Sequence, residues 1–171
     1  TCPTGTLKRI KELIRVGSGD ILTFTGSLPG GIGKDAAISF LKDLTRQGVR
    51  VVIDSKSISP SELREIKPWL IKPNAEEIFD FFGKDADRNT SPDEKLLEKT
   101  ALDVAASGIE NVMISLGGDG AILASDGKLW RAKNPKIDAI STIGAGDSSI
   151  AGFITAFSRN ASKADCLREA V

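Results

Sequence analysis

The strongest constraint on the fold is a regular alternation of short apolar runs with segments whose apolar residues have helical spacing. Runs such as "DILTFT", "VRVVID" and "NVMISL" are almost continuously apolar and rich in β-branched residues, which is typical of strands buried on both faces. Between these runs, apolar residues recur three and four positions apart, as on one face of an amphipathic helix. The alternation predicts an α/β fold in which helices cover both faces of a mostly parallel sheet, in three layers. We expect a single core over residues 1–171.

The clearest local signals are one helix start and one hairpin turn. Ser91 can cap a helix, Pro92 suits its first position, and Glu94 completes a capping box. Asp126 and Gly127 form the dipeptide that favours a tight turn between two strands. The remaining predicted strands cover residues 20–25, 49–54, 69–73 and 111–116, and further helices are predicted at 7–14, 35–47, 60–66, 74–82 and 146–157 and from residue 163.

The composition excludes several kinds of chemistry. The chain has no histidine and no tyrosine, so serine–histidine–aspartate, cysteine–histidine and histidine-ligated zinc sites are excluded within it. Cys2 and Cys166 lie far apart and lack metal-ligand spacing, which favours a reduced, cytoplasmic protein. The 23 basic and 23 acidic residues give a net charge of zero, so we expect no nucleic-acid partner and no anionic membrane partner. No apolar run has the length of a membrane span.

Four loops follow predicted strands and could carry the function. Three are rich in glycine, at residues 26–31, 115–120 and 142–149, and the fourth is "KPNAEE" at residues 72–77. Each one alone can be an ordinary turn. In a parallel sheet, however, such loops meet at one edge, and together they offer what the phosphates of a nucleotide and their metal ion require. The P-loop and dinucleotide-binding fingerprints are both incomplete, because Leu28 and Ser149 stand where glycines are needed.

An acidic residue, Asp147, lies in the middle of "STIGAGDSSIAGF". Small residues there lead into a helical pattern, and the unpaired N–H groups at a helix start favour an anion. As a helix cap, Asp147 would contribute about 1 kcal/mol. As a general base, it would accept a proton from an acceptor hydroxyl, while the N–H groups of residues 144–147 stabilise a phosphoryl group in transfer. The residues alone leave both interpretations open.

Three further residues also have a structural and a functional interpretation. Asn74 and Glu77 are spaced to form a capping box, or to contact the hydration shell of Mg²⁺. Lys72 can pair with a phosphate or be an ordinary exposed lysine at the end of a strand. Cys166 is most simply a small apolar residue on a helix face.

The motifs together resemble a known family. "STIGAGDSSIAGF" resembles the C-terminal signature of the ribokinase-like (PfkB) carbohydrate kinases, and "GSLPGGI", "VVIDSKS", "LIKPNAEE" and "SLGGDGAIL" stand in the order of that family. The resemblance covers residues 21–157. It is greatest to the branch that acts on hexose phosphates, above all the kinases that convert fructose 1-phosphate to the 1,6-bisphosphate, with tagatose-6-phosphate kinases close behind.

The resemblance implies a catalytic role for the last of the four loops. Asp147 is then the base that deprotonates the sugar hydroxyl, and Gly144, Ala145 and Gly146 form the anion hole for the phosphoryl group. Ser27, in the "GSLP" loop, is implied to be a neighbour of the sugar phosphate substrate.

The resemblance also implies ATP and Mg²⁺ as cofactors. Asn74 and Glu77 match the family's N-x-x-E motif, which acts on the Mg²⁺–nucleotide indirectly. The residues implied to bind the nucleotide are Lys72, Asn74, Ser115, Leu116, Gly117, Gly118, Asp119, Gly120, Gly146 and Asp147.

Several parts of the family pattern are missing from the sequence. The N-terminal sugar-binding signature, the small β-sheet lid and the end of the adenine pocket are absent. The resemblance therefore implies a C-terminal core fragment that is inactive alone, from a parent kinase that forms a homodimer through the lid. Two alternatives of another class are a non-catalytic nucleotide-binding module and a scaffold fragment that binds no ligand.

Overall fold

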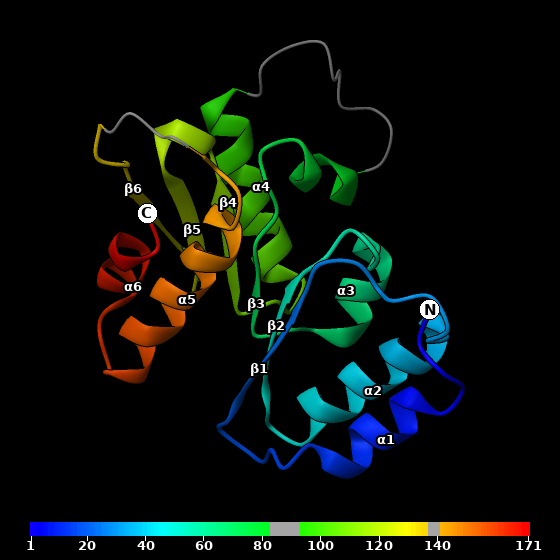
Figure 1. Ribbon diagram of the computed structural model, residues 1–171. Coiled ribbons are helices and arrows are strands. Elements are labelled where there is room, and N and C mark those ends of the chain that lie inside the picture. Colours follow the sequence, from blue (N-terminus) through cyan, green and yellow to red (C-terminus); the bar gives the residue numbers. More distant parts are fainter. Residues whose placement is uncertain (83–92, 137–140) are drawn as a thin grey trace. The chain divides into compact units, whose positions relative to one another are not determined.

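The computed structural model describes residues 1–82, 93–136 and 141–171. The chain divides into two compact units, which are described separately below. Figure 1 shows α1 to α3 with β1 to β3, which belong to the first unit, and α4 to α6 with β4 to β6, which belong to the second.

The first unit, Thr1–Ile71 with Gly108–Glu110, is built on three parallel strands. The middle strand is buried along its centre, as expected for a continuously apolar strand between two neighbours. The strands are β1 (Ile21–Thr25), β2 (Arg50–Asp54) and β3 (Leu70–Ile71), and the helices are α1 (Thr6–Leu13), α2 (Lys34–Arg46) and α3 (Pro60–Ile66).

The connection from α2 to β2 follows the predicted glycine. α2 packs on β2, and Gly48 follows its C-cap residue with a φ of +80°, a conformation that glycine adopts without strain. A Cβ at this position would lie 2.7 Å from the hydroxyl oxygen of Ser18. The turn therefore needs glycine both for its conformation and for its space.

The second unit, Lys72–Ser107 with Asn111–Val171, contains three antiparallel strands among its described residues. α4 packs against β4 and β5, whereas α6 packs against β5 and β6 and against α5, so that helices lie on both sides of the strands (Figure 1). The strands are β4 (Asn111–Ser115), β5 (Ala121–Ser125) and β6 (Lys128–Ala132). The α-helices are α4 (Glu94–Ala106), α5 (Ala145–Ser158) and α6 (Lys163–Glu169), and the 3-10 helices are η1 (Glu77–Phe82) and η2 (Gly117–Asp119).

The hairpin between β5 and β6 is confirmed. Asp126 and Gly127 have φ angles of +50° and +68°, which a two-residue turn of this kind requires, and Ser125 lies opposite Lys128. The α/β class is confirmed in both units, with parallel strands in the first and the antiparallel hairpin in the second. A single core over the whole chain stays a prediction.

Two predicted helices differ in detail from the structure. The segment after Asn74 forms the 3-10 helix η1, not an α-helix. α4 begins at Glu94, and its cap is Asp93, whose carboxylate accepts a hydrogen bond from the N–H of Lys95 at 3.3 Å. The predicted cap, Ser91, and Pro92 lie outside the described residues, as do residues 137–140, just before the loop at 142–149. A side-chain cap is present, but Asp93 provides it, two residues after Ser91. The predicted capping box is wrong, because Glu94 is the first residue of the helix and not its third.

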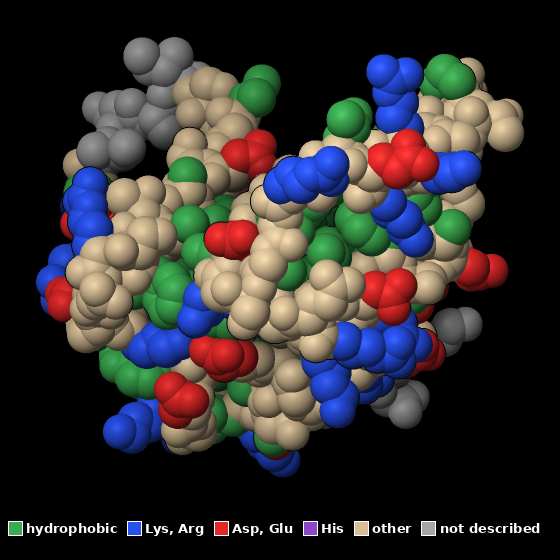
Figure 2. All heavy atoms as spheres, turned by 90° about the horizontal axis from the view of Figure 1, so that it is seen from below, with side chains coloured by type: hydrophobic (Ala, Val, Ile, Leu, Met, Phe, Trp, Pro, Cys, Tyr) green, Lys and Arg blue, Asp and Glu red, His purple; other side chains and the backbone are tan. Residues whose placement is uncertain are grey.

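The surface carries both signs of charge. On the face shown in Figure 2, Lys and Arg side chains are interspersed with Asp and Glu side chains. None of the helices in the described ranges has the length and apolar character needed to cross a lipid bilayer.

We predict that Gly152→Ala destabilises the second unit. In most helix interiors, alanine is favoured over glycine by up to about 1 kcal/mol. At Gly152, however, a Cβ would overlap the carbonyl oxygen of Glu169, where α5 packs against the end of α6. We expect the free energy of unfolding in urea to fall by about 1–3 kcal/mol, as for other overpacked sites. Gly17→Ala is the control, because its Cβ would meet no atom within 4 Å. A Gly152→Ala variant that is more stable than the parent would contradict the prediction.

Candidate functional site

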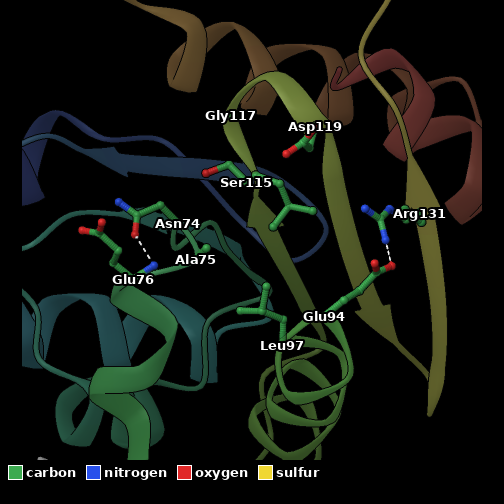
Figure 3. A pocket seen from close by; sticks show the side chains of 10 residues that line it. Asn74, Ala75, Glu76, Glu94, Leu97, Ser115, Gly117, Asp119 and Arg131 are labelled. Carbon is green, nitrogen blue, oxygen red and sulfur yellow. Dashed lines mark hydrogen bonds and ion pairs between the residues drawn. The ribbon is translucent and has the colours of Figure 1, made fainter. Parts of the chain in front are cut away.

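A cavity of about 510 Å³ lies in the second unit, next to the end of β4. It is bounded by the segment that follows Pro73, the start of α4, the turn after β4, and β6 (Figure 3). Its lining residues are Asn74, Ala75, Glu76, Glu94, Leu97, Ser115, Leu116, Gly117, Asp119 and Arg131.

Two of the predicted loops meet in this cavity because their backbones pair. Asn74 and Ser115 form a parallel bridge, and the N–H of Ser115 donates to the carbonyl oxygen of Pro73 at 3.0 Å. The loops at residues 72–77 and 115–120 are therefore held side by side at the carboxyl end of β4, as the strand pattern predicts.

The turn after β4 presents free backbone donors. Gly117 and Gly120 have φ angles of +58° and +97°, and the N–H of Leu116 donates to the carbonyl oxygen of Gly120 at 2.8 Å. The N–H groups of Gly117 and Gly118 donate to no acceptor in the described part of the chain. Asn134 holds the turn from outside, since its Nδ2 donates to the carbonyl oxygen of Gly117 at 2.9 Å. An anion can therefore approach these N–H groups without displacing an existing bond.

Asn74 and Glu77 form a capping box at the start of η1. The Asn74 Oδ1 accepts hydrogen bonds from the N–H groups of Glu76 at 2.9 Å and Glu77 at 2.8 Å. In return, the Glu77 Oε2 accepts from the N–H of Asn74 at 3.0 Å. The structural interpretation of this pair is present in the molecule. No group of three or more Asp, Glu, Cys or His residues suited to a metal ion occurs within residues 1–82, 93–136 and 141–171.

Lys72 is not an exposed lysine. It is only 8% exposed, and the residue takes part in at least one polar or electrostatic interaction. The alternative of an ordinary exposed lysine at a strand end is therefore wrong. Lys72 lies two residues before Asn74 but does not itself line the cavity.

Asp147 is not the cap of α5. The N-cap position belongs to Gly144, whose φ is +80°, and α5 begins at Ala145, so that Asp147 is the third residue of the helix. The Asp147 side chain is exposed, and its carboxylate makes no hydrogen bond or ion pair with the described residues. The interpretation of Asp147 as the helix cap is wrong because the backbone conformation places glycine there.

The predicted anion hole is open at two of its three residues. The N–H of Ala145 donates to the carbonyl oxygen of Thr142 at 3.2 Å. The N–H groups of Gly144 and Gly146 donate to no described acceptor. Two donors at the start of a 14-residue helix are therefore available to an anion.

Ser27 belongs to the first unit, where the loop after β2 makes hydrogen bonds to the residues before and after it. The Ser55 hydroxyl donates to the carbonyl oxygen of Gly26, and the N–H of Leu28 donates to the Ser57 hydroxyl oxygen at 2.8 Å. The Ser27 side chain itself is exposed.

The cysteine that the sequence predicts to be a small apolar residue is buried. Cys166 is 0% exposed on α6, and burial raises the pKa of its thiol. A raised pKa disfavours the thiolate, so Cys166 is a poor nucleophile.

The structure thus brings part of the predicted set into one cavity. The predicted residues that line the cavity are Asn74, Ser115, Leu116, Gly117 and Asp119, whereas Lys72, Glu77, Gly118, Gly120 and Gly144 to Asp147 do not line it.

Sequence reasoning missed the other half of the lining. Glu76 directly follows the predicted Asn74, and its position in "KPNAEE" could have indicated it. For Glu94, the sequence predicts only a capping role. Arg131 stands in the hairpin strand "KLWRA" without a motif, so only the folded hairpin brings it to the cavity.

Comparison with known proteins gives one family. The family described as pfkB family carbohydrate kinase matches residues 5–171. A 1-phosphofructokinase of Borreliella burgdorferi is 34% identical over 158 residues, which make up 92% of this chain and 50% of that protein. A 1-phosphofructokinase of Haemophilus influenzae is 35% identical over 151 residues, or 86% of this chain and 46% of that protein.

A solved structure shows the same fold. Phosphofructokinase-2 from Escherichia coli, in complex with substrates and products, matches 94% of this chain and 50% of its own with a TM-score of 0.78 and 26% identity. This match confirms the predicted ribokinase-like α/β class. The chain spans about half the length of the curated relatives it matches.

We predict that the Asn74 cap contributes to stability through its side-chain oxygen. Asn74→Ala removes an acceptor that serves two N–H groups, so the free energy of unfolding should fall by about 1 kcal/mol. Asn74→Asp retains an acceptor and should cost less than about 0.5 kcal/mol, since a carboxylate at this position is also a good cap. Urea unfolding of both variants measures the difference. Equal losses for both would show that the oxygen is not the stabilising group.

Proposed function

Because the chain belongs to the pfkB family of carbohydrate kinases, we propose that it supplies the nucleotide site and the catalytic base of an ATP-dependent sugar-phosphate kinase. The observation that carries the proposal is the pairing of Asn74 with Ser115, which brings the loops at residues 72–77 and 115–120 to one cavity. The exposed carboxylate of Asp147 at the start of α5 supports the second part.

Asp147 acts as the general base in this proposal. Its carboxylate accepts the proton of the sugar hydroxyl as the hydroxyl oxygen attacks the terminal phosphorus of ATP and the bond to the ADP oxygen breaks. Neither hydrogen bonds nor ion pairs with described residues compete for this carboxylate. The absence of histidine and tyrosine leaves few other groups for the task.

The start of α5 stabilises the charge that develops on the phosphoryl group. The N–H groups of Gly144 and Gly146 are available as donors, and that of Ala145 becomes available if it leaves its 3.2 Å bond to Thr142. Positive potential at the helix start adds to these donors. The remaining proposed nucleotide contacts come from Lys72 and from Ser115 to Gly120.

The residues at the start of η1 fit a magnesium ion through water. Asn74 and Glu77 offer oxygen atoms, which suit Mg²⁺, and Mg²⁺ commonly keeps several waters. Their present bonds to backbone N–H groups favour contact through those waters over direct ligation. When bound, the ion neutralises charge on the phosphate oxygens.

The proposed substrate is fructose 1-phosphate, and the product is the 1,6-bisphosphate. Curated relatives at 34% and 35% identity are named 1-phosphofructokinase. Fructose 6-phosphate is the second candidate, because a solved phosphofructokinase-2 at 26% identity is in complex with it. Tagatose 6-phosphate is the third sugar to test. Ser27 is the proposed neighbour of the sugar.

The whole enzyme is proposed to be longer, cytoplasmic and oligomeric. The curated relatives are about twice the length of this chain, and one solved neighbour is a tetrameric form of phosphofructokinase-2. We propose that dimerisation uses a lid outside these residues, and that the 171-residue chain alone binds nucleotide without turnover. A non-catalytic nucleotide-binding module would release no ADP with any sugar phosphate, even in the complete protein.

We predict that Asp147→Asn lowers kcat by about 10²–10⁴-fold in the complete kinase that contains this chain, which is the usual range for loss of a general base. The affinity for Mg-ATP should stay close to normal, since the amide has the size of the carboxylate. A coupled assay of ADP release with each of the three sugar phosphates measures turnover, and fructose 1-phosphate should give the highest kcat/KM.

Asp165→Asn is the matched control for this prediction. Asp165 also occupies the first turn of its helix, α6, behind the cap residue Ser162, and it should leave turnover unchanged. If Asp147→Asn keeps nearly full turnover, Asp147 is not the general base.

A further inference from the structure

The cavity has an unusual charge for a site that is to hold a nucleotide. Among the ten described residues that line it, three are carboxylates, namely Glu76, Glu94 and Asp119, and one is a cation, Arg131. The carboxylates of Glu76 and Asp119 make no ion pair with the described residues. A polyphosphate entering this cavity therefore meets like charges, and it needs compensating positive charge to bind.

Arg131 already faces the cavity. It extends from β6 toward Glu94 at the start of α4, and the two side chains form an ion pair (Figure 3). The side chain of Arg131 is 33% exposed and that of Glu94 is 54% exposed. Solvent screens such a pair, so little stability is lost when it opens.

A phosphate is a better partner for Arg131 than Glu94 is. The guanidinium fork can donate two parallel hydrogen bonds to phosphate oxygens, and a phosphate chain brings more negative charge than one carboxylate. Lys72, the one basic residue of the predicted nucleotide set, is buried and does not line the cavity. The side chain that can compensate the negative charge of a phosphate in this cavity is thus Arg131, on the β5–β6 hairpin, and not a residue of the loop motifs.

We propose that Arg131 is a nucleotide-binding residue that exchanges its ion pair with Glu94 for the phosphates of bound Mg-ATP. This inference rests on the proposed nucleotide site. Glu94 holds the guanidinium at the cavity in the free protein and competes with the ligand for it. Removal of each partner therefore has an opposite effect on nucleotide affinity.

Titration calorimetry of the chain with Mg-ATP tests the exchange. Arg131→Gln should raise the Kd by about 10- to 100-fold, which corresponds to the loss of charge-assisted hydrogen bonds. Arg131→Lys keeps the charge but loses the fork, so its Kd should lie between those of the parent and Arg131→Gln. Glu94→Gln should bind Mg-ATP more tightly than the unmodified chain, because the competing carboxylate is removed, and an unchanged Kd would contradict the exchange.

Two controls separate direct contact from the general field of the protein. Lys128→Gln removes a positive charge from an exposed position of the same strand, and Glu98→Gln removes a negative charge one turn along α4. Neither residue lines the cavity, so each should change the Kd by less than about twofold.

The outcomes distinguish this inference from the proposed function. If the parent binds Mg-ATP and Arg131→Gln binds it equally well, the role of Arg131 is wrong and the nucleotide site stands. If Arg131→Gln and Glu94→Gln both weaken binding, the pair is structural and the exchange is wrong. If the parent shows no heat with millimolar Mg-ATP, the nucleotide site and the role of Arg131 are both wrong. Urea unfolding of each variant checks that the variant is folded, so that a raised Kd reports lost binding and not lost structure.

Discussion

The contact between Ser115 and the segment before Asn74 sets up the candidate site. The Ser115 N–H reaches the carbonyl oxygen of Pro73 at 3.0 Å, and this bond closes the short parallel bridge. Asn74 then pairs through its backbone and caps through its side chain. Both loops of the cavity start from this one point, which fixes their separation.

A zero net charge is compatible with the proposed phosphate site because the cavity offers peptide dipoles and one local cation, Arg131. The N–H group of Gly117, which lines the cavity, offers the positive end of a peptide dipole without any charged side chain. Around it lie carboxylates, which repel a free polyphosphate but favour one that carries a divalent cation. The chain's global charge therefore says little about this ligand. The arrangement of charges and N–H groups around the cavity decides which anion can bind there.

Sequence reasoning succeeded where the signal is local. Asp126 and Gly127 favour the positive φ angles that their turn requires. Gly48 ends α2 for the same reason. It failed where chemically equivalent groups compete over a few positions, so that Asp93 caps α4. Arg131 has no sequence signal, because its place in the cavity lining depends on the register of β6 and on its ion pair with Glu94 of α4. Motifs predict which loops lie at the end of a strand, but a side chain that reaches a cavity from a neighbouring strand is found only in the folded structure.

The position of Asp147 links the proposed chemistry to packing elsewhere on α5. Gly144 takes the N-cap, so the carboxylate is released from capping and projects from the same turn as the free N–H groups. The proposed base and the proposed anion donors are thereby parts of one helix, so their relative geometry cannot vary independently. That element is anchored further along by Gly152, which lets α5 approach Glu169 at the end of α6. Any shift of α5 on α6 would move base and donors together. Close packing five residues away is therefore a condition for the position of the reactive turn, although no residue of that contact touches it.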